Sequence, residues 1–153
     1  MGLEQTPWKE TAIRVMPEHA TVLAEADTPY SLWIELWFLF EAAYREPRDV
    51  SLIERIYKYA DWCELQPRGE TADDDLLTCV SVCFYEHIPT CEAAREDLPN
   101  WFSKEDFINM RSVFRYFFNE DEFKKIEEEF VGRTFRTWEW DDPEDAANVR
   151  RSD

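Results

Sequence analysis

Five segments of the sequence begin with the same pattern, a helix cap followed by a stripe of apolar residues. In each segment a Thr, Asp, Ser or Asn precedes the first turn, where its side chain can accept the N–H groups that a helix leaves free. Apolar residues then recur three and four positions apart, which is the spacing of one helix face. The five cap residues are Thr28, Asp49, Thr71, Ser103 and Asn119. The pattern predicts an all-α protein with minimal strand content.

Glycine is scarce, with three residues in a chain of 153. Tight β-hairpin turns and phosphate-binding loops both depend on glycine, so its scarcity also favours helices with short connections. We expect a single irregular bundle of about six helices. Stacked helix pairs are the alternative, and we prefer the bundle because no repeat period is visible. The predicted helical domain covers residues 1–132, and a poorly structured acidic C-terminal tail covers residues 133–153.

The chain is strongly acidic and rich in aromatic residues at the same time. It carries 34 Asp and Glu against 17 Lys and Arg, a formal net charge of -17, and 16% of its residues are aromatic. Acidic disordered chains lack aromatic residues, so the combination indicates a folded acidic domain. The basic residues are scattered rather than clustered, which argues against a nucleic-acid partner. The same charge repels anionic membranes, so we expect neither class of partner.

The N-terminal residues and the cysteines bear on the compartment. The start of the chain lacks the basic and apolar regions of a secretory signal peptide, and no apolar run approaches the length of a membrane span. We therefore expect a cytoplasmic protein. Its four cysteines are then expected to be thiols rather than disulfides, because the cytosol is reducing.

The most specific cluster of chemically active residues is Cys79, Cys83 and His87, followed by Cys91. The first three are four positions apart, so on one continuous helix they share a face. Sulfur and imidazole ligands at this spacing are a candidate metal or thiol site. The three nevertheless span about 12 Å along a helix, which is too far for one tetrahedral ion. We expect core thiols, with no bound metal and no cofactor.

Three functional hypotheses follow. The first, which we favour, is a non-enzymatic interaction module of the inhibitor, immunity or adaptor type that binds a basic protein partner through an acidic surface with aromatic residues; bacterial immunity proteins are the analogy. The second is a small enzyme or metal/thiol site built on Cys79, Cys83 and His87. The third is a structural subunit of a homo-oligomer, because seven Trp and eleven Phe exceed the needs of one small core.

The candidate partner-binding residues are concentrated in the tail. Two indoles, at Trp138 and Trp140, precede a run of carboxylates, and on an extended segment they face the same way. The carboxylates of this run are Asp141, Asp142, Glu144 and Asp145. Two other acidic runs are weaker candidates for the same role, Asp73 to Asp75 and Glu127 to Glu129.

Overall fold

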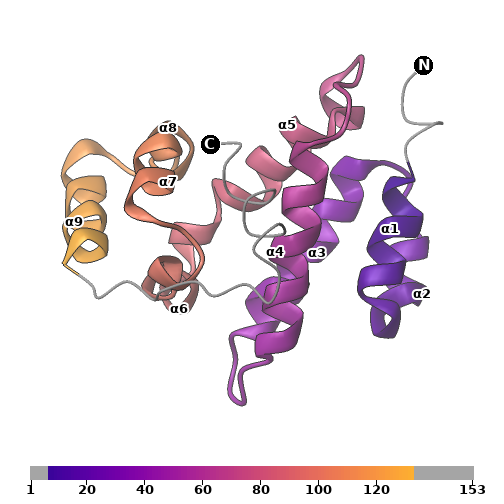
Figure 1. Ribbon diagram of the computed structural model, residues 1–153, viewed down its shortest axis with the longest axis horizontal. Coiled ribbons are helices and arrows are strands. Elements are labelled where there is room, and N and C mark those ends of the chain that lie inside the picture. Colours follow the sequence, from indigo (N-terminus) through magenta and orange to yellow (C-terminus); the bar gives the residue numbers. More distant parts are fainter. Residues whose placement is uncertain (1–6, 133–153) are drawn as a thin grey trace. The chain divides into compact units, whose positions relative to one another are not determined.

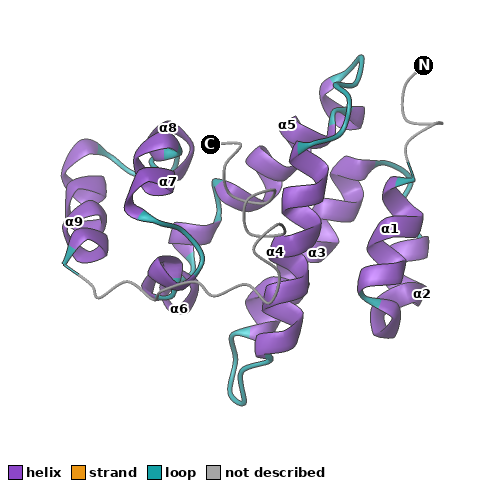
Figure 2. Cartoon of the chain, in the orientation of Figure 1, coloured by secondary structure: helices purple, strands orange, loops and turns teal. Residues whose placement is uncertain are grey.

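The computed structural model describes residues 7–132, and this part of the chain consists of helices and their connections (Figures 1 and 2). The all-α prediction is confirmed. The described residues contain nine α-helices rather than about six, because several expected helices are shorter or divided. They also form two compact units where one bundle was expected, with unit 1 ending at His87 and unit 2 starting at Ile88. Within the described ranges, no helix has the length and apolar character needed to cross a membrane.

Unit 1 is built on three helices that pack against one another in pairs, namely α3 (Pro29–Ala43), α4 (Val50–Glu64) and α5 (Leu76–Val80) (Figure 1). The N-terminal helices are α1 (Trp8–Val15), which packs on α3 and α4, and α2 (Ala20–Ala24). Two 3-10 turns, Pro17–His19 and Ala72–Asp74, and a π-helical turn, Ser81–Tyr85, complete the unit.

The predicted caps of unit 1 are present, but the one at Thr71 caps a 3-10 turn instead of an α-helix. The Thr28 side chain accepts from the N–H of Ser31 at 3.1 Å, and Asp49 accepts from the N–H of Leu52 at 3.1 Å. The predicted pairing of Thr71 with Asp74 also forms, but it closes only a 3-10 turn. Helix α5 starts after that turn and is capped by Asp75 instead.

Phe84 lies at the centre of the unit 1 core. Its ring is 5.1 Å from the ring of Trp33 and 4.8 Å from that of Phe40, both on α3. It is also 5.4 Å from the ring of Tyr57 on α4. All four side chains are buried. Phe84 therefore joins the end of the α5 segment to both long helices.

The α5 segment does not continue as one regular helix. After Val80 the chain enters the π-helical turn, in which the N–H of Glu86 donates to the carbonyl of Ser81 at 2.9 Å. A bond to the fifth preceding residue widens the turn, so residues beyond it no longer follow the α-helical spacing. The regular α-helical geometry on which a shared face of Cys79, Cys83 and His87 would depend therefore ends at Val80.

The described part of unit 2, residues 88–132, contains four α-helices. They are α6 (Glu92–Glu96), α7 (Lys104–Asn109), α8 (Arg111–Phe114) and α9 (Glu120–Val131), with 3-10 turns at Ile88–Thr90 and Leu98–Asn100. The predicted cap at Ser103 forms with Asp106, and the one at Asn119 forms with Glu122. The helix expected after Ser103 is divided at Met110, whose backbone has φ -101° and ψ 10°.

Phe107 organises the core of unit 2. Its ring stacks on the ring of Phe130 with centroids 4.2 Å apart, and on that of Phe123 at 5.9 Å. The ring of Phe114 lies 5.4 Å away. These contacts fix α9 against α7 and α8. An ion pair between Arg95 and Glu129, at 3.6 Å, connects α6 to α9.

Candidate functional site

Two of the predicted site cysteines, Cys79 and Cys83, are buried in unit 1. The Cys79 thiol donates to the carbonyl of Ala72 at 3.4 Å, and the Cys83 thiol lies 3.9 Å from the carbonyl of Tyr30. Burial raises the pKa of Cys79 to about 12 and that of Cys83 to about 11. Both side chains are therefore protonated thiols at neutral pH, whereas nucleophiles and metal ligands are thiolates.

The other two members of the predicted cluster, His87 and Cys91, are only half-buried. His87 follows the π-helical turn and is half-buried, with its ring 5.4 Å from the ring of Trp37. Burial lowers the pKa of His87, and the Glu41 carboxylate opposes that shift. Cys91 belongs to unit 2. Within residues 7–132, no three His, Cys, Asp or Glu side chains form a group suited to a metal ion.

A Cys83–His87 pair would need proton transfer from the thiol to the imidazole to become reactive. The raised pKa of Cys83 and the lowered pKa of His87 both oppose that transfer. Reactive cysteines lie in surroundings that lower the thiol pKa instead. The environment of this pair thus favours two neutral side chains in a core over a nucleophile and its base.

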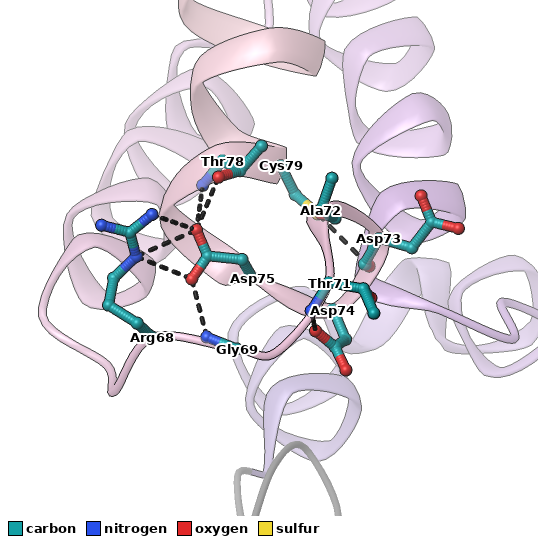
Figure 3. A network of polar contacts seen from close by, with 9 residues as sticks. All are labelled: Arg68, Gly69, Thr71, Ala72, Asp73, Asp74, Asp75, Thr78 and Cys79. Atoms are coloured by element: carbon teal, nitrogen blue, oxygen red, sulfur yellow. Dashed lines mark hydrogen bonds and ion pairs between the residues drawn. The ribbon is translucent and has the colours of Figure 1, made fainter.

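A buried carboxylate, Asp75, organises the loop before α5 (Figure 3). Its oxygens accept from Arg68 Nε at 2.8 and 3.0 Å, and from the N–H of Gly69 at 2.7 Å. On the other side they accept from the hydroxyl of Thr78 at 2.5 Å and from its N–H at 3.2 Å. The Arg68 guanidinium and these donors hold the pKa of Asp75 well below its usual range. Asp75 is therefore a fully bonded anion that connects the loop to the helix.

The close approach at Gly69 explains one of the three glycines. A Cβ at this position would lie 2.4 Å from the carbonyl oxygen of Asp74, far inside van der Waals contact.

Asp75 was expected to lie in an acidic surface run together with Asp73 and Asp74. The structure separates them, because Asp75 is only 3% exposed while Asp73 is exposed. The ion pair of Asp75 with Arg68, seven residues earlier, could not be predicted from the local sequence pattern.

Unit 2 carries a surface that combines aromatic rings with carboxylates. Tyr116 is 65% exposed and Phe117 is 47% exposed, and their rings meet edge to face with centroids 5.0 Å apart. The exposed carboxylates of Glu120, Asp121 and Glu122 follow in the first turn of α9. We call these five residues the aromatic–acidic surface. The Trp residues within residues 7–132 are buried or half-buried, so they do not contribute exposed rings to this surface.

A groove of about 510 Å³ runs between α7–α8 and α9 in unit 2. Its volume is within the range of sites that hold small ligands or anchoring side chains. We call it the α7–α9 groove. It is lined by Lys104, Phe107, Ile108 and Arg111 on one side and by Lys124, Glu127, Glu128, Phe130, Val131 and Gly132 on the other. The sequence did not reveal it, because a groove requires two separate helices to meet.

The predicted partner-binding residues of the tail lie outside the described residues. They are Trp138, Trp140, Asp141, Asp142, Glu144 and Asp145. Their role in binding stays a prediction. Comparisons of the chain with protein-family models, with curated proteins and with solved structures found no match.

Proposed function

We propose that this protein is a non-enzymatic interaction module that binds a basic protein partner. The observation that carries the proposal is the aromatic–acidic surface of unit 2, where two neighbouring exposed rings precede three exposed carboxylates. Exposed aromatic residues are enriched where proteins bind one another, because they offer a large apolar area at low entropic cost. Such a surface suits an inhibitor, immunity or adaptor protein.

The chemistry of this surface selects the sign of the partner's charge. The ring of Tyr116 can accept a Lys or Arg side chain over its face, and the carboxylates of α9 can pair with neighbouring cations. The formal net charge of -17 draws basic surfaces toward the chain and speeds encounter. The acidic tail, with Trp138 and Trp140, is a second proposed contact for the same partner. A basic protein fits these features better than nucleic acid or an anionic membrane, and we place the interaction in the cytoplasm.

The enzyme hypothesis is less well supported. A thiol site on Cys79, Cys83 and His87 would require at least one thiolate near neutral pH. Burial raises the pKa of both thiols far above neutrality, and Cys79 points its sulfur toward backbone carbonyls. These features favour a structural role for the cysteines.

Capture from a native lysate, using matched variants, tests the proposal. We would immobilise the wild-type chain, a Tyr116→Ser/Phe117→Ser variant, and a Val50→Ser/Leu65→Ser control that removes two exposed apolar side chains of unit 1. The expected result is one basic protein captured by the wild type and the control but lost with the Tyr116/Phe117 variant. Its association with the wild type should slow as salt is raised, because screening weakens the attraction.

Two outcomes would contradict the proposal. One is equal capture of the same protein by all three forms, which would place binding away from the aromatic–acidic surface. The other is an association rate that does not change with salt, which would remove the electrostatic argument.

A structural subunit of a homo-oligomer is the second candidate function, and one observation favours it. Ile34 and Phe38 are exposed one turn apart on α3, so they form a continuous apolar stripe on unit 1. Such stripes are often covered by another copy of a chain. Sedimentation of the wild type and of Phe38→Ser tests this alternative, with Val50→Ser as the control. A monomeric wild-type protein would exclude it.

A further inference from the structure

The α7–α9 groove is formed by two helical stripes that face each other. On α7 and α8 the lining residues recur three and four positions apart, from Lys104 to Arg111. On α9 they recur in the same way, from Lys124 to Val131. The stacked rings of Phe107 and Phe130, 4.2 Å apart, connect the two stripes. Two buried rings of the unit 2 core therefore form part of the lining of the groove.

Two apolar side chains of the groove are open to solvent. Ile108 is 61% exposed and Val131 is 54% exposed, one on each side. An apolar side chain placed between them would remove both from water, which is favourable. An aromatic ring suits this position, because it offers a large apolar area to both side chains.

The rim of the groove differs in charge from the rest of the chain. It carries three cations, Lys104, Arg111 and Lys124, and two carboxylates, Glu127 and Glu128. Arg111 forms an ion pair with Glu127. The rim is thus net positive in a chain whose formal net charge is -17. An occupant of this groove should combine apolar and acidic groups.

The chain itself supplies a segment of this composition immediately after the groove. Helix α9 ends at Val131, and both Val131 and Gly132 line the groove. Trp138 and Trp140 follow a few residues later and precede a run of carboxylates from Asp141 to Asp145. Six extended residues span at most about 20 Å. The groove follows α9 for about 10 Å, so the indoles can reach any part of it.

We propose that the segment 133–145 of the same chain docks into the α7–α9 groove. An indole of Trp138 or Trp140 lies between Ile108 and Val131, and the acidic residues after it lie beside Lys104 and Lys124. A free acidic peptide would be repelled by the charge of the whole chain, but a tethered segment has an effective concentration in the millimolar range. The inference goes beyond the proposed function, because it concerns a contact of the chain with itself. A partner that contacts Trp138 and Trp140 would have to displace the docked segment first.

Methyl NMR on the full chain tests the docking directly. The ring current of a docked indole shifts the methyl signals of Ile108 and Val131. In a Trp138→Ala/Trp140→Ala variant these signals should move, while those of Val50 and Leu65, exposed in unit 1, should stay in place. Unchanged Ile108 and Val131 signals would overturn the proposal. So would shifts confined to methyl groups of unit 1.

A charge-reversal pair tests the rim without changing the segment. Both lysines are exposed, but only Lys124 lines the groove, and its neighbour Lys125 does not line it. Lys124→Glu should move the Ile108 and Val131 signals toward their positions in the double-Trp variant, and Lys125→Glu should not. Raising the salt concentration on the wild-type chain should act in the same direction as Lys124→Glu, because it screens the rim. Equal responses of the two lysine variants would contradict a contact at the rim.

The same spectra distinguish docking within one chain from exchange between two copies. Docking within a chain is independent of protein concentration, so dilution should leave the Ile108 and Val131 signals unchanged. Signals that move on dilution, together with a dimer in sedimentation, would replace the proposal by an exchange of segments between copies.

Discussion

Unit 1 and unit 2 differ in the length of the helices that cover their aromatic cores. In unit 1, α3 and α4 have 15 residues each and enclose Phe84. In unit 2 the longest helix, α9, has 12 residues, and α6, α7 and α8 have 5, 6 and 4. Among the residues that the structure describes, four large apolar side chains are exposed in each unit, but in unit 2 they lie within a shorter stretch of chain. Short helices cover fewer rows of side chains, so unit 2 combines a core with open apolar surfaces.

We expect the stability of the chain to depend chiefly on unit 1, and the proposed binding to depend chiefly on unit 2. Substitutions that open the unit 1 core should therefore reduce the free energy of unfolding most. Substitutions of the exposed rings in unit 2 should change binding with little effect on stability.

Phe84→Ala should have the largest effect on stability. It removes a buried ring that contacts both α3 and α4, so we expect a loss of about 3–5 kcal/mol in the free energy of unfolding. Urea denaturation followed by circular dichroism measures this loss. Phe117→Ala in unit 2, where the ring is exposed, is the matched control and should cost far less. Equal losses for the two variants would remove the distinction between the units.

Asp75→Ala should have the next largest effect. The change removes the α5 cap and leaves the N–H groups of Gly69 and Thr78 without their carboxylate acceptor. We expect a loss of about 2 kcal/mol in the free energy of unfolding. Asp73→Ala, a short distance away and exposed, is the control and should be close to neutral. If both variants unfold at the same urea concentration, the Asp75 network does not stabilise unit 1.

Acid should weaken a second polar contact of unit 1. Arg55 donates to both oxygens of Glu18, and this lowers the pKa of Glu18 from 4.5 to about 2. Because the folded-state pKa is the lower one, the contact stabilises the fold above pH 4.5 and loses that effect as the pH falls toward 2. Arg55→Met should therefore lower the urea midpoint at neutral pH and have a smaller effect in acid. An effect independent of pH would show that Arg55 acts by packing alone.

The prediction with the smallest expected effect requires no substitution. Burial raises the pKa of Cys63 and Cys79 to about 12, and that of Cys83 to about 11, whereas Cys91 of unit 2 is only half-buried. In the folded protein a thiol reagent should therefore label Cys91 first and the three cysteines of unit 1 slowly. Mass spectrometry after short exposure identifies the labelled residue. Rapid labelling of Cys79 or Cys83 would revive the thiol-site hypothesis.

The local features of the fold could be predicted from the sequence. The caps at Thr28, Asp49, Ser103 and Asn119 depend on a bond to a residue three positions later, so the pattern contains both partners. The same holds for the all-α class, which follows from helical periodicity.

Features that depend on distant contacts could not be predicted in this way. The π-helical turn at Ser81–Tyr85 accompanies the packing of Phe84 between α3 and α4, which are far away in sequence. For the same reason the spacing of Cys79, Cys83 and His87 did not show that the α-helix ends at Val80. The division into two units and the α7–α9 groove also depend on which helices contact one another. A short sequence pattern does not predict contacts between separate helices.

The stacking of Phe130 on Phe107 has a practical consequence for anyone who handles this protein. It fixes the last turn of α9, so the described part of the chain ends with Val131 and Gly132 at the groove. An affinity tag or fluorescent protein fused to the C-terminus would be attached to the very segment proposed to dock there, and its bulk would compete with that docking. Fusions at the N-terminus leave the proposed docking segment unaltered, so they are the better choice for assays of the groove.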